Sequence, residues 1–277
     1  MARCEAVACL PSAALRDREM PLASSDMTLD RAYPDLFNVE EARLMRELME
    51  PPESNRPRTR VIRAGVELDV SLYLCDGFMG RFSCDRLGRR QFVALQVPGD
   101  YVDLPAYLLK KLDYDVDSLG LSISRLTRHD RLQMVGHEFP DLYRKLWRIT
   151  MIDSAIHRYW IFRVGRLAGK ARLANFFCEM FLRLFARGLA QPEGFALPTS
   201  QADLAEICGV TPVHVNRLLA ELRLDGICTF TNARLDILDL PRLFRVGEHS
   251  RGYLFLSDEV EETVRPLIGD NGRRFNT

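Results

Sequence analysis

The chain has 277 residues, of which 47% are hydrophobic and 27% charged, so it can bury one or two ordinary cores. This composition excludes a disulfide-stapled peptide and a wholly disordered protein. Because 38 Lys and Arg residues balance 38 Asp and Glu residues, bulk charge predicts affinity for neither nucleic acid nor membranes, and any such argument must come from local motifs.

Cysteine spacing and hydropathy bear on the compartment. Seven cysteines are too sparse and irregular for a disulfide framework, which favours a reducing environment. The apolar stretch 6–15 is interrupted by Pro11 and makes a poor signal peptide. Uncharged apolar runs all fall short of the roughly 20 residues that cross a bilayer. We therefore expect a cytoplasmic protein with no membrane partner.

The N-terminal part begins without lasting periodicity. Residues 1–30 mix Ala, Ser, Pro and isolated charges, and we expect a poorly ordered tail. The spacing of apolar residues predicts a short amphipathic helix from Val39 to Met49. The polar segment 53–60, rich in Pro and Arg, is expected to be a loop.

A period-two pattern follows. From Val61 to Val97, short alternating runs of apolar and polar residues are separated by turns that contain glycine, and a last strand is expected at Leu119–Ile123. Such runs predict an antiparallel sheet or small barrel. We place this sensor-like β-domain at residues 31–138.

A long helix is predicted at residues 139–167, because Pro140 opens a segment without Gly or Pro as far as Gly165. Its seam of residues, spaced alternately by four and three, needs a partner. The residues expected at a dimer interface are Leu142, Leu146, Ile149, Asp153, Ile156 and Trp160. The alternative is a helix that is buried under the sheet and exposes only a basic face.

Residues 200–222 carry the most specific pattern. Ser200 and Asp203 predict a capping box that starts a helix over residues 201–208. Thr211 and Pro212 predict the start of a second helix.

This spacing predicts a helix-turn-helix, which needs a small residue where the helices touch, glycine in the turn and branched residues inside the second helix. These core places are filled, in order, by Ala205, Gly209, Val215 and Leu218. Two short strands around residues 231–233 predict a wing. Residues 168–249 are therefore expected to form a winged helix-turn-helix, followed by a C-terminal extension at 250–277.

The segments Leu197–Ala205, Gly209–Arg217 and Leu235–Asp239 resemble the C-terminal domain of Crp/Fnr-type transcription regulators. The resemblance covers residues 60–245. It implies an α+β protein with an N-terminal antiparallel, jelly-roll-like β-roll of the cyclic-nucleotide-binding type, a long dimerisation helix and a C-terminal winged helix-turn-helix. It also implies a regulator, not an enzyme, that binds a palindromic operator as a homodimer.

The resemblance makes residues 211–222 the recognition helix. The residues expected at DNA are Thr211, Pro212, Val213, His214, Asn216 and Arg217. The Arg217 guanidinium can bond O6 and N7 of guanine, and Val213 can contact a thymine methyl. Expected partners are double-stranded DNA, a second copy of the chain, RNA polymerase and a small-molecule effector that the sequence does not identify. The alternative function is a scaffold that uses the β-roll and winged helix for protein contacts.

The sensor motifs of the family are incomplete. Members that bind cyclic AMP carry a Gly-Glu pair and a later Arg-Ser/Thr pair, whereas this chain has Gly99-Asp100 and a carboxylate-rich loop at Asp113–Ser118. The cysteines that could hold an iron-sulfur cluster, Cys4, Cys9, Cys75 and Cys84, do not match the spacing of the oxygen-sensing members. We expect no cyclic-nucleotide binding, no cofactor and no metal, and four gathered thiolates are the alternative.

Overall fold

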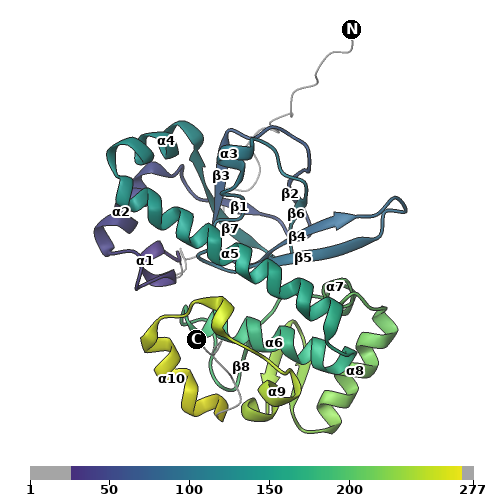
Figure 1. The fold of residues 1–277 in the computed structure, drawn as a ribbon. Coiled ribbons are helices and arrows are strands. Elements are labelled where there is room, and N and C mark those ends of the chain that lie inside the picture. The colour runs from purple at the N-terminus through teal and green to yellow at the C-terminus, as the bar shows by residue number, and fades with distance from the viewer. Residues whose placement is uncertain (1–25, 270–277) are drawn as a thin grey trace, which may run out of the picture.

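The computed structural model describes residues 26–269. Most of the expected tail, with Cys4 and Cys9, lies outside the described residues, as do residues 270–277. In Figure 1 the long helix α5 (Pro140–Arg166) crosses the molecule between an upper β-domain and a lower, mainly helical domain. The α+β fold expected from the sequence is confirmed.

The described chain enters the β-domain earlier than the sequence predicts. Met27 and Leu29, placed in the expected tail, are buried, and Leu29 begins the one-turn helix α1 (Leu29–Ala32). Helix α2 (Val39–Leu48) follows as predicted and starts at Asn38, whose side chain accepts from the Glu41 amide in a capping box. These two helices pack against one end of the sheets through Met45.

Two antiparallel sheets form the β-domain. The smaller has the order β1 (Glu53–Asn55), β7 (Ser122–Arg128), β3 (Val70–Asp76). The larger has the order β2 (Arg60–Ile62), β6 (Asp115–Ser118), β4 (Met79–Cys84), β5 (Arg90–Gln96). The β4–β5 hairpin projects to the right in Figure 1, and the short helix α3 (Ala106–Leu109) precedes β6.

Three predictions for this domain are wrong in detail. The segment 53–60, expected to be a loop, contains β1 and the start of β2. The loop expected at 113–118 contains β6, and the strand expected at 119–123 begins only at Ser122. The physical reason is that β1 is a polar edge strand, and the carboxylates of β6 form ion pairs with arginines on other strands. Neither strand therefore has the alternation of apolar and polar residues from which a strand is predicted.

Helix α5 is present as predicted, but its apolar seam packs against other elements of the same protomer. Leu142, Leu146 and Ile149 pack in one core with Tyr73 and Tyr101 of the β-domain. These seam residues are therefore buried within the protomer and are not free to form the dimer interface expected at them. The reason is that α4 (His129–Glu138), the sheets and α6 (Gly169–Phe185) already cover the seam.

The C-terminal half of the seam also contacts other elements of the same protomer. Ile156 and Trp160 are 7% and 3% exposed and pack against α6, while Asp153 pairs with Arg81 of β4. In helix α6 every residue from Leu173 to Leu184 is buried. A helix buried all round has neighbours on every side, and α6 packs against α5, α7, α8 and α9.

The remaining elements surround α6. They are β8 (Gly194–Ala196), α7 (Gln201–Cys208), α8 (Pro212–Leu224), β9 (Cys228–Thr231), β10 (Arg234–Ile237), α9 (Leu240–Val246), η1 (Gly252–Leu254) and α10 (Asp258–Ile268). Strands β8, β10 and β9 form a small antiparallel sheet in that order. Within residues 26–269, every helix is too short or too polar to cross a membrane.

Candidate nucleic-acid interface

Helix α7 begins and ends where the sequence predicts. The Asp203 amide donates to Ser200 Oγ at 3.1 Å, and the Ser200 amide donates to Asp203 Oδ2 at 2.6 Å. Gly209 ends the helix with φ of +63°, a backbone conformation that residues with a Cβ rarely adopt. The end of α7 is also held by Arg172, which donates to the Cys208 carbonyl at 2.6 Å and was not singled out from the sequence.

Helix α8 starts at the predicted place. Thr211 is its N-cap and accepts from the His214 amide at 3.3 Å, and Pro212 occupies the first turn. The helix continues to Leu224, two residues beyond the expected end. The local capping signals therefore fix where α8 begins.

The two faces of α8 differ sharply. The predicted core residues Ala205, Val215 and Leu218 are 2%, 0% and 3% exposed, so α7 and α8 meet as in a helix-turn-helix. On the opposite face Val213 is 81% exposed, and Thr211, Pro212, Asn216 and Arg217 are exposed as well. Because the described residues leave these side chains exposed, the side chains are accessible to a groove of DNA.

His214 is placed differently from the other expected contact residues. It is half-buried beside Gly169, where an added Cβ would lie 2.7 Å from His214 Nε2. Its Nδ1 lies 2.9 Å from Arg217 Nη2, and Arg217 Nε lies 3.8 Å from Glu221. His214 therefore orients Arg217 from the side of α6 instead of projecting fully outward.

The wing has the geometry of a tight hairpin. Strands β9 and β10 pair from Thr231↔Arg234 to Cys228↔Ile237, and Asn232 and Ala233 at the tip both have positive φ. Arg234 is exposed at this tip and pairs with Asp236. The wing thus offers an exposed guanidinium next to the helix-turn-helix.

Ion pairs join this unit to the β-domain. Arg58 donates to Asp203 at 2.7 Å, and Arg90 of β5 pairs with Glu206 at 2.9 Å. Gln91 also donates to the Glu206 carbonyl at 2.5 Å. The first helix of the helix-turn-helix is therefore docked on the sheet, whereas the exposed face of α8 is left uncovered.

The interior of the β-domain is already occupied by a buried arginine that the sequence analysis missed. Arg81 is 1% exposed, donates to Asp153 of α5 at 2.6 Å and to the Val102 carbonyl at 2.8 Å, and lies over the Tyr114 ring. A buried arginine in the middle of β4 has no signal in a pattern search, because its spacing is that of an ordinary strand residue.

Two carboxylates of the carboxylate-rich segment Asp113–Ser118 form ion pairs. Asp115 lies 2.9 Å from Arg60, and Asp117 lies 2.9 Å from Arg90. Two of the three aspartates of this segment are therefore paired with cations. That cyclic nucleotides do not bind stays a prediction, and the buried Arg81 lies between β4 and Asp153 of α5.

The two described sensor cysteines do not form a common site. Cys75 is buried in β3, and burial raises the pKa of its thiol to about 12. Cys84 is exposed at the end of β4, opposite Arg90. A protonated buried thiol and a thiol on a projecting hairpin do not fit a shared set of thiolate ligands.

Comparison with known proteins agrees with the geometry. Residues 171–246 match the family model of the Crp-like helix-turn-helix domain. The chain is 25% identical to the transcriptional activator protein FnrL of Cereibacter sphaeroides over 70% of this chain and 79% of that protein. It is 22% identical to the anaerobic regulatory protein of Pasteurella multocida over 77% of this chain and 78% of that one.

A solved structure has the same fold over most of this chain. The structure of FixK2 from Bradyrhizobium japonicum superposes with a TM-score of 0.64 and 23% identity. The match covers 71% of this chain and 96% of the other. The β-domain, α5 and the winged helix therefore occur together in a known fold.

Proposed function

We propose that this chain, a DNA-binding transcription regulator of the Crp/Fnr type, acts as a homodimer that places α8 of each protomer in successive major grooves of a palindromic operator. The observation that carries the proposal is the face of α8 on which Thr211, Pro212, Val213, Asn216 and Arg217 are all exposed. We assign residues 31–138 to a sensor domain, 139–167 to the dimerisation helix, 168–249 to the DNA-binding domain and 250–277 to an extension.

The proposed dimer face lies on the side of α5 opposite the buried seam. Met151, Ile161 and Phe162 are 55%, 75% and 46% exposed, although they are large and apolar. The face follows a second four-three spacing through Trp147, Met151, Ser154, Arg158, Ile161 and Gly165. This spacing is typical of a helix that pairs with a copy of itself.

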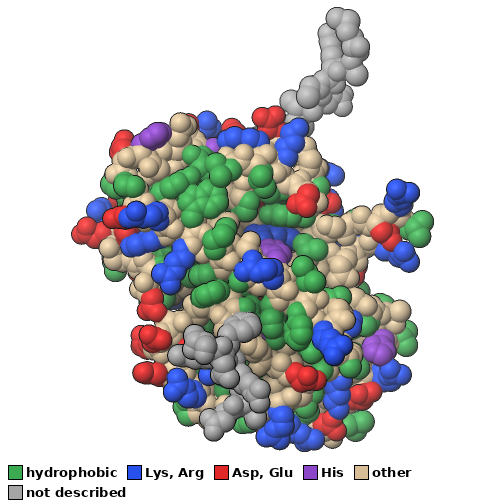
Figure 2. Space-filling view, in the orientation of Figure 1, with side chains coloured by type: hydrophobic (Ala, Val, Ile, Leu, Met, Phe, Trp, Pro, Cys, Tyr) green, Lys and Arg blue, Asp and Glu red, His purple; other side chains and the backbone are tan. Residues whose placement is uncertain are grey.

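The surface around this stripe supports the same choice. Figure 2 shows apolar side chains gathered over α3, α4 and the start of α5 and continuing along α5. Tyr107, Tyr143 and Trp147 form a chain of edge-to-face ring contacts in this region. A cluster of exposed apolar side chains of this kind favours contact with another protein surface.

Arg217 is the proposed main reader of base edges, supported by Asn216 and Val213. Its side chain is 66% exposed and is held only by His214 and a long contact to Glu221, so it is free to reach guanine. RNA polymerase and a small-molecule effector are further proposed partners, since the fold joins a sensor domain to the DNA-binding unit.

The test is selection of bound duplexes from random DNA with the purified full chain, followed by sequencing. We expect a two-fold symmetric site whose halves lie about one helical turn apart. Arg217→Ala should lose about 1–3 kcal/mol of discrimination per half-site at one base pair.

Arg223→Ala is the matched control, because Arg223 lies exposed at the far end of the same helix. It should weaken binding similarly for all sequences, if at all. Selection of no motif, or of the same motif by the Arg217 variant with undiminished preference, would contradict the proposal and favour the scaffold alternative.

A further inference from the structure

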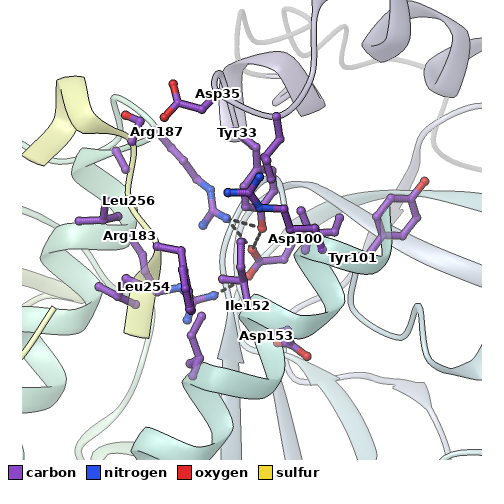
Figure 3. A pocket seen from close by; sticks show the side chains of 18 of the residues that line it. Tyr33, Asp35, Asp100, Tyr101, Ile152, Asp153, Arg183, Arg187, Leu254 and Leu256 are labelled. Atoms are coloured by element: carbon purple, nitrogen blue, oxygen red, sulfur yellow. Dashed lines mark hydrogen bonds and ion pairs between the residues drawn. The ribbon is translucent and has the colours of Figure 1, made fainter. Parts of the chain in front are cut away.

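A cavity of about 130 Å³ lies where three parts of the chain meet. The β-domain contributes Tyr33 and Asp100, α5 contributes Ile152, α6 contributes Arg183, and the turn after α6 contributes Arg187. Figure 3 shows both arginines reaching across to Asp100. The cavity borders the Arg81 network, because Asp153 and Tyr101, which accept hydrogen bonds from Arg81, also line it.

The fourth wall is the C-terminal extension, through Leu254, Leu256 and Val260. These residues lie beyond the segment 171–246 that matches the Crp-like domain. The cavity therefore includes a part of the chain outside the matched segment, although Tyr253, Leu254 and Val264 of this part pack in the same core as α6 and α9.

The polar end of the cavity is built from buried charges. Asp100 accepts from Arg183 Nη2 at 2.6 Å, from Arg187 Nη2 at 2.6 Å and from the Val97 amide at 3.0 Å. Tyr33 also donates to it at 3.1 Å. The carboxylate is thus fully satisfied, and it holds two guanidinium groups against the cavity.

The two guanidinium groups keep spare hydrogen-bond donors. Arg183 and Arg187 have side chains that are 4% and 6% exposed. Arg187 Nη1 and Arg183 Nε are buried, and neither has a hydrogen-bond partner among residues 26–269. Burying such donors without an acceptor is unfavourable, so an acceptor in the cavity would be stabilising.

The buried charges also leave a positive excess. Among the described residues, Arg163, Arg183 and Arg187 share only two buried carboxylates, Glu179 and Asp100. The other charges at the cavity cancel. Asp153 is paired with Arg81, and Asp35 and Arg148 lie at the exposed rim with opposite signs.

The remaining walls are apolar. They are formed by Leu104, Ile149, Ile152, Ile156, Leu254 and Leu256. A cavity of about 150 Å³ is known to hold benzene, so this one suits a compact body of similar size. A ligand that fits must therefore carry a negative charge at one end and an apolar group at the other.

We propose that this cavity binds a small organic carboxylate, whose charged end lies against Arg187 and Arg183 and whose apolar end lies against Ile152 and the C-terminal extension. One carboxylate would neutralise the excess charge and accept from the spare donors. Because the ligand touches the sensor domain, α6 and the extension together, its binding stabilises their arrangement. The proposal concerns the free protein and does not depend on DNA binding.

The test is calorimetric titration of the purified full chain, without DNA, with benzoate and with 3-methylbutanoate at fixed ionic strength. Benzamide is the neutral analogue of benzoate, and inorganic phosphate is the anion without an apolar part. We expect saturable binding of at least one carboxylate and about tenfold or more weaker binding of benzamide and phosphate.

Variants locate the site. Arg187→Met should weaken carboxylate binding about tenfold or more, while Asp100 keeps Arg183 as a partner. Leu256→Trp should abolish binding by filling the cavity without changing any charge. Asp100→Asn should strengthen binding, because it removes the internal carboxylate that competes for both arginines. Arg144→Met, at a side chain 77% exposed on α5, is the control and should bind as the wild type does.

Three results would overturn the proposal. One is the absence of a saturable isotherm for both carboxylates up to about 10 mM, a concentration that corresponds to negligible affinity. Another is equal binding of benzamide or phosphate. The third is unchanged carboxylate binding in a folded Leu256→Trp protein, with folding checked by circular dichroism and thermal unfolding.

Discussion

Helices α8 and α5 each bury one apolar stripe, but the partners that cover the two stripes differ in how far away they lie along the chain. In α8 the buried stripe is local, because Val215 and Leu218 meet α7 only a few residues away. In α5 the buried stripe is covered by partners from distant parts of the sequence, including α4, the sheets and α6. The comparison teaches that an apolar seam shows that a helix has a partner but does not identify the partner.

The largest effect expected from this comparison is at the α5 seam. Leu146→Asp would bury an unpaired charge in the core of the protomer, which costs several kcal/mol, so we expect a protein that fails to fold. Ile161→Asp, on the exposed side of the same helix, should leave the protomer folded. Circular dichroism and urea unfolding of both variants test this difference, and equal stability of the two would contradict the assignment of the faces.

The next effect concerns the buried charges that join α5 to α6. Arg163 and Glu179 are both 0% exposed, and Glu179 also accepts from Trp160 and Tyr253. Burial alone would raise the pKa of Glu179, but Arg163 and Arg183 lower it below its ordinary value. Glu179→Gln should therefore cost about 3–5 kcal/mol, as expected when one partner of a buried pair is removed.

Urea unfolding measures this loss. The control is Glu221→Gln on α8, because that carboxylate makes only a long contact to an exposed arginine. Its loss should change the free energy of unfolding by less than about 0.5 kcal/mol. A similarly small effect of Glu179→Gln would show that the buried pair does not hold the two helices together.

The buried side chain of His249 makes the stability of the fold depend on pH. Burial lowers the pKa of His249 from 6.5 to about 3. Between these pH values the unfolded chain binds a proton at this residue and the folded chain does not, so stability falls as pH decreases from 6.5 towards 3. The slope from this one residue is about 1.4 kcal/mol per pH unit.

His249→Gln should remove that part of the slope, whereas His137→Gln, at an exposed position, should keep it. Urea unfolding at pH 6, 5 and 4 measures the slopes. Parallel profiles for wild type and the His249 variant would mean that His249 is not held neutral in the folded protein.

The smallest effect is expected on the exposed stripe of α8. Val213→Ala should change the free energy of unfolding by less than about 0.5 kcal/mol, because the side chain is 81% exposed. It should nevertheless change the preference for thymine at one operator position by about 0.5–1 kcal/mol. Competition binding with single-base operator variants measures this preference, and a loss of stability without a change of preference would place Val213 in the fold instead of the interface.

The predictability of each region follows from how local its causes are. The caps at Ser200 and Thr211 and the positive φ of Gly209 arise within a few residues, so the sequence predicts both helices of the helix-turn-helix and their exposed side. Strand β6 was missed because its aspartates are stabilised by Arg60 and Arg90, which come from other strands. The positions of Arg81, Arg183 and Arg187 depend on tertiary packing alone, and no local signal marks them.

The central claim is that the exposed side of α5 joins two copies so that two α8 helices face DNA together. Sedimentation velocity of the wild type and Ile161→Asp, alone and with a duplex carrying the selected operator, tests it most directly. We predict a wild-type dimer that binds one duplex as two protomers, and a folded Ile161→Asp monomer that binds the duplex far more weakly. A wild type that stays monomeric on the operator, or an Ile161→Asp protein that remains dimeric, would contradict the account.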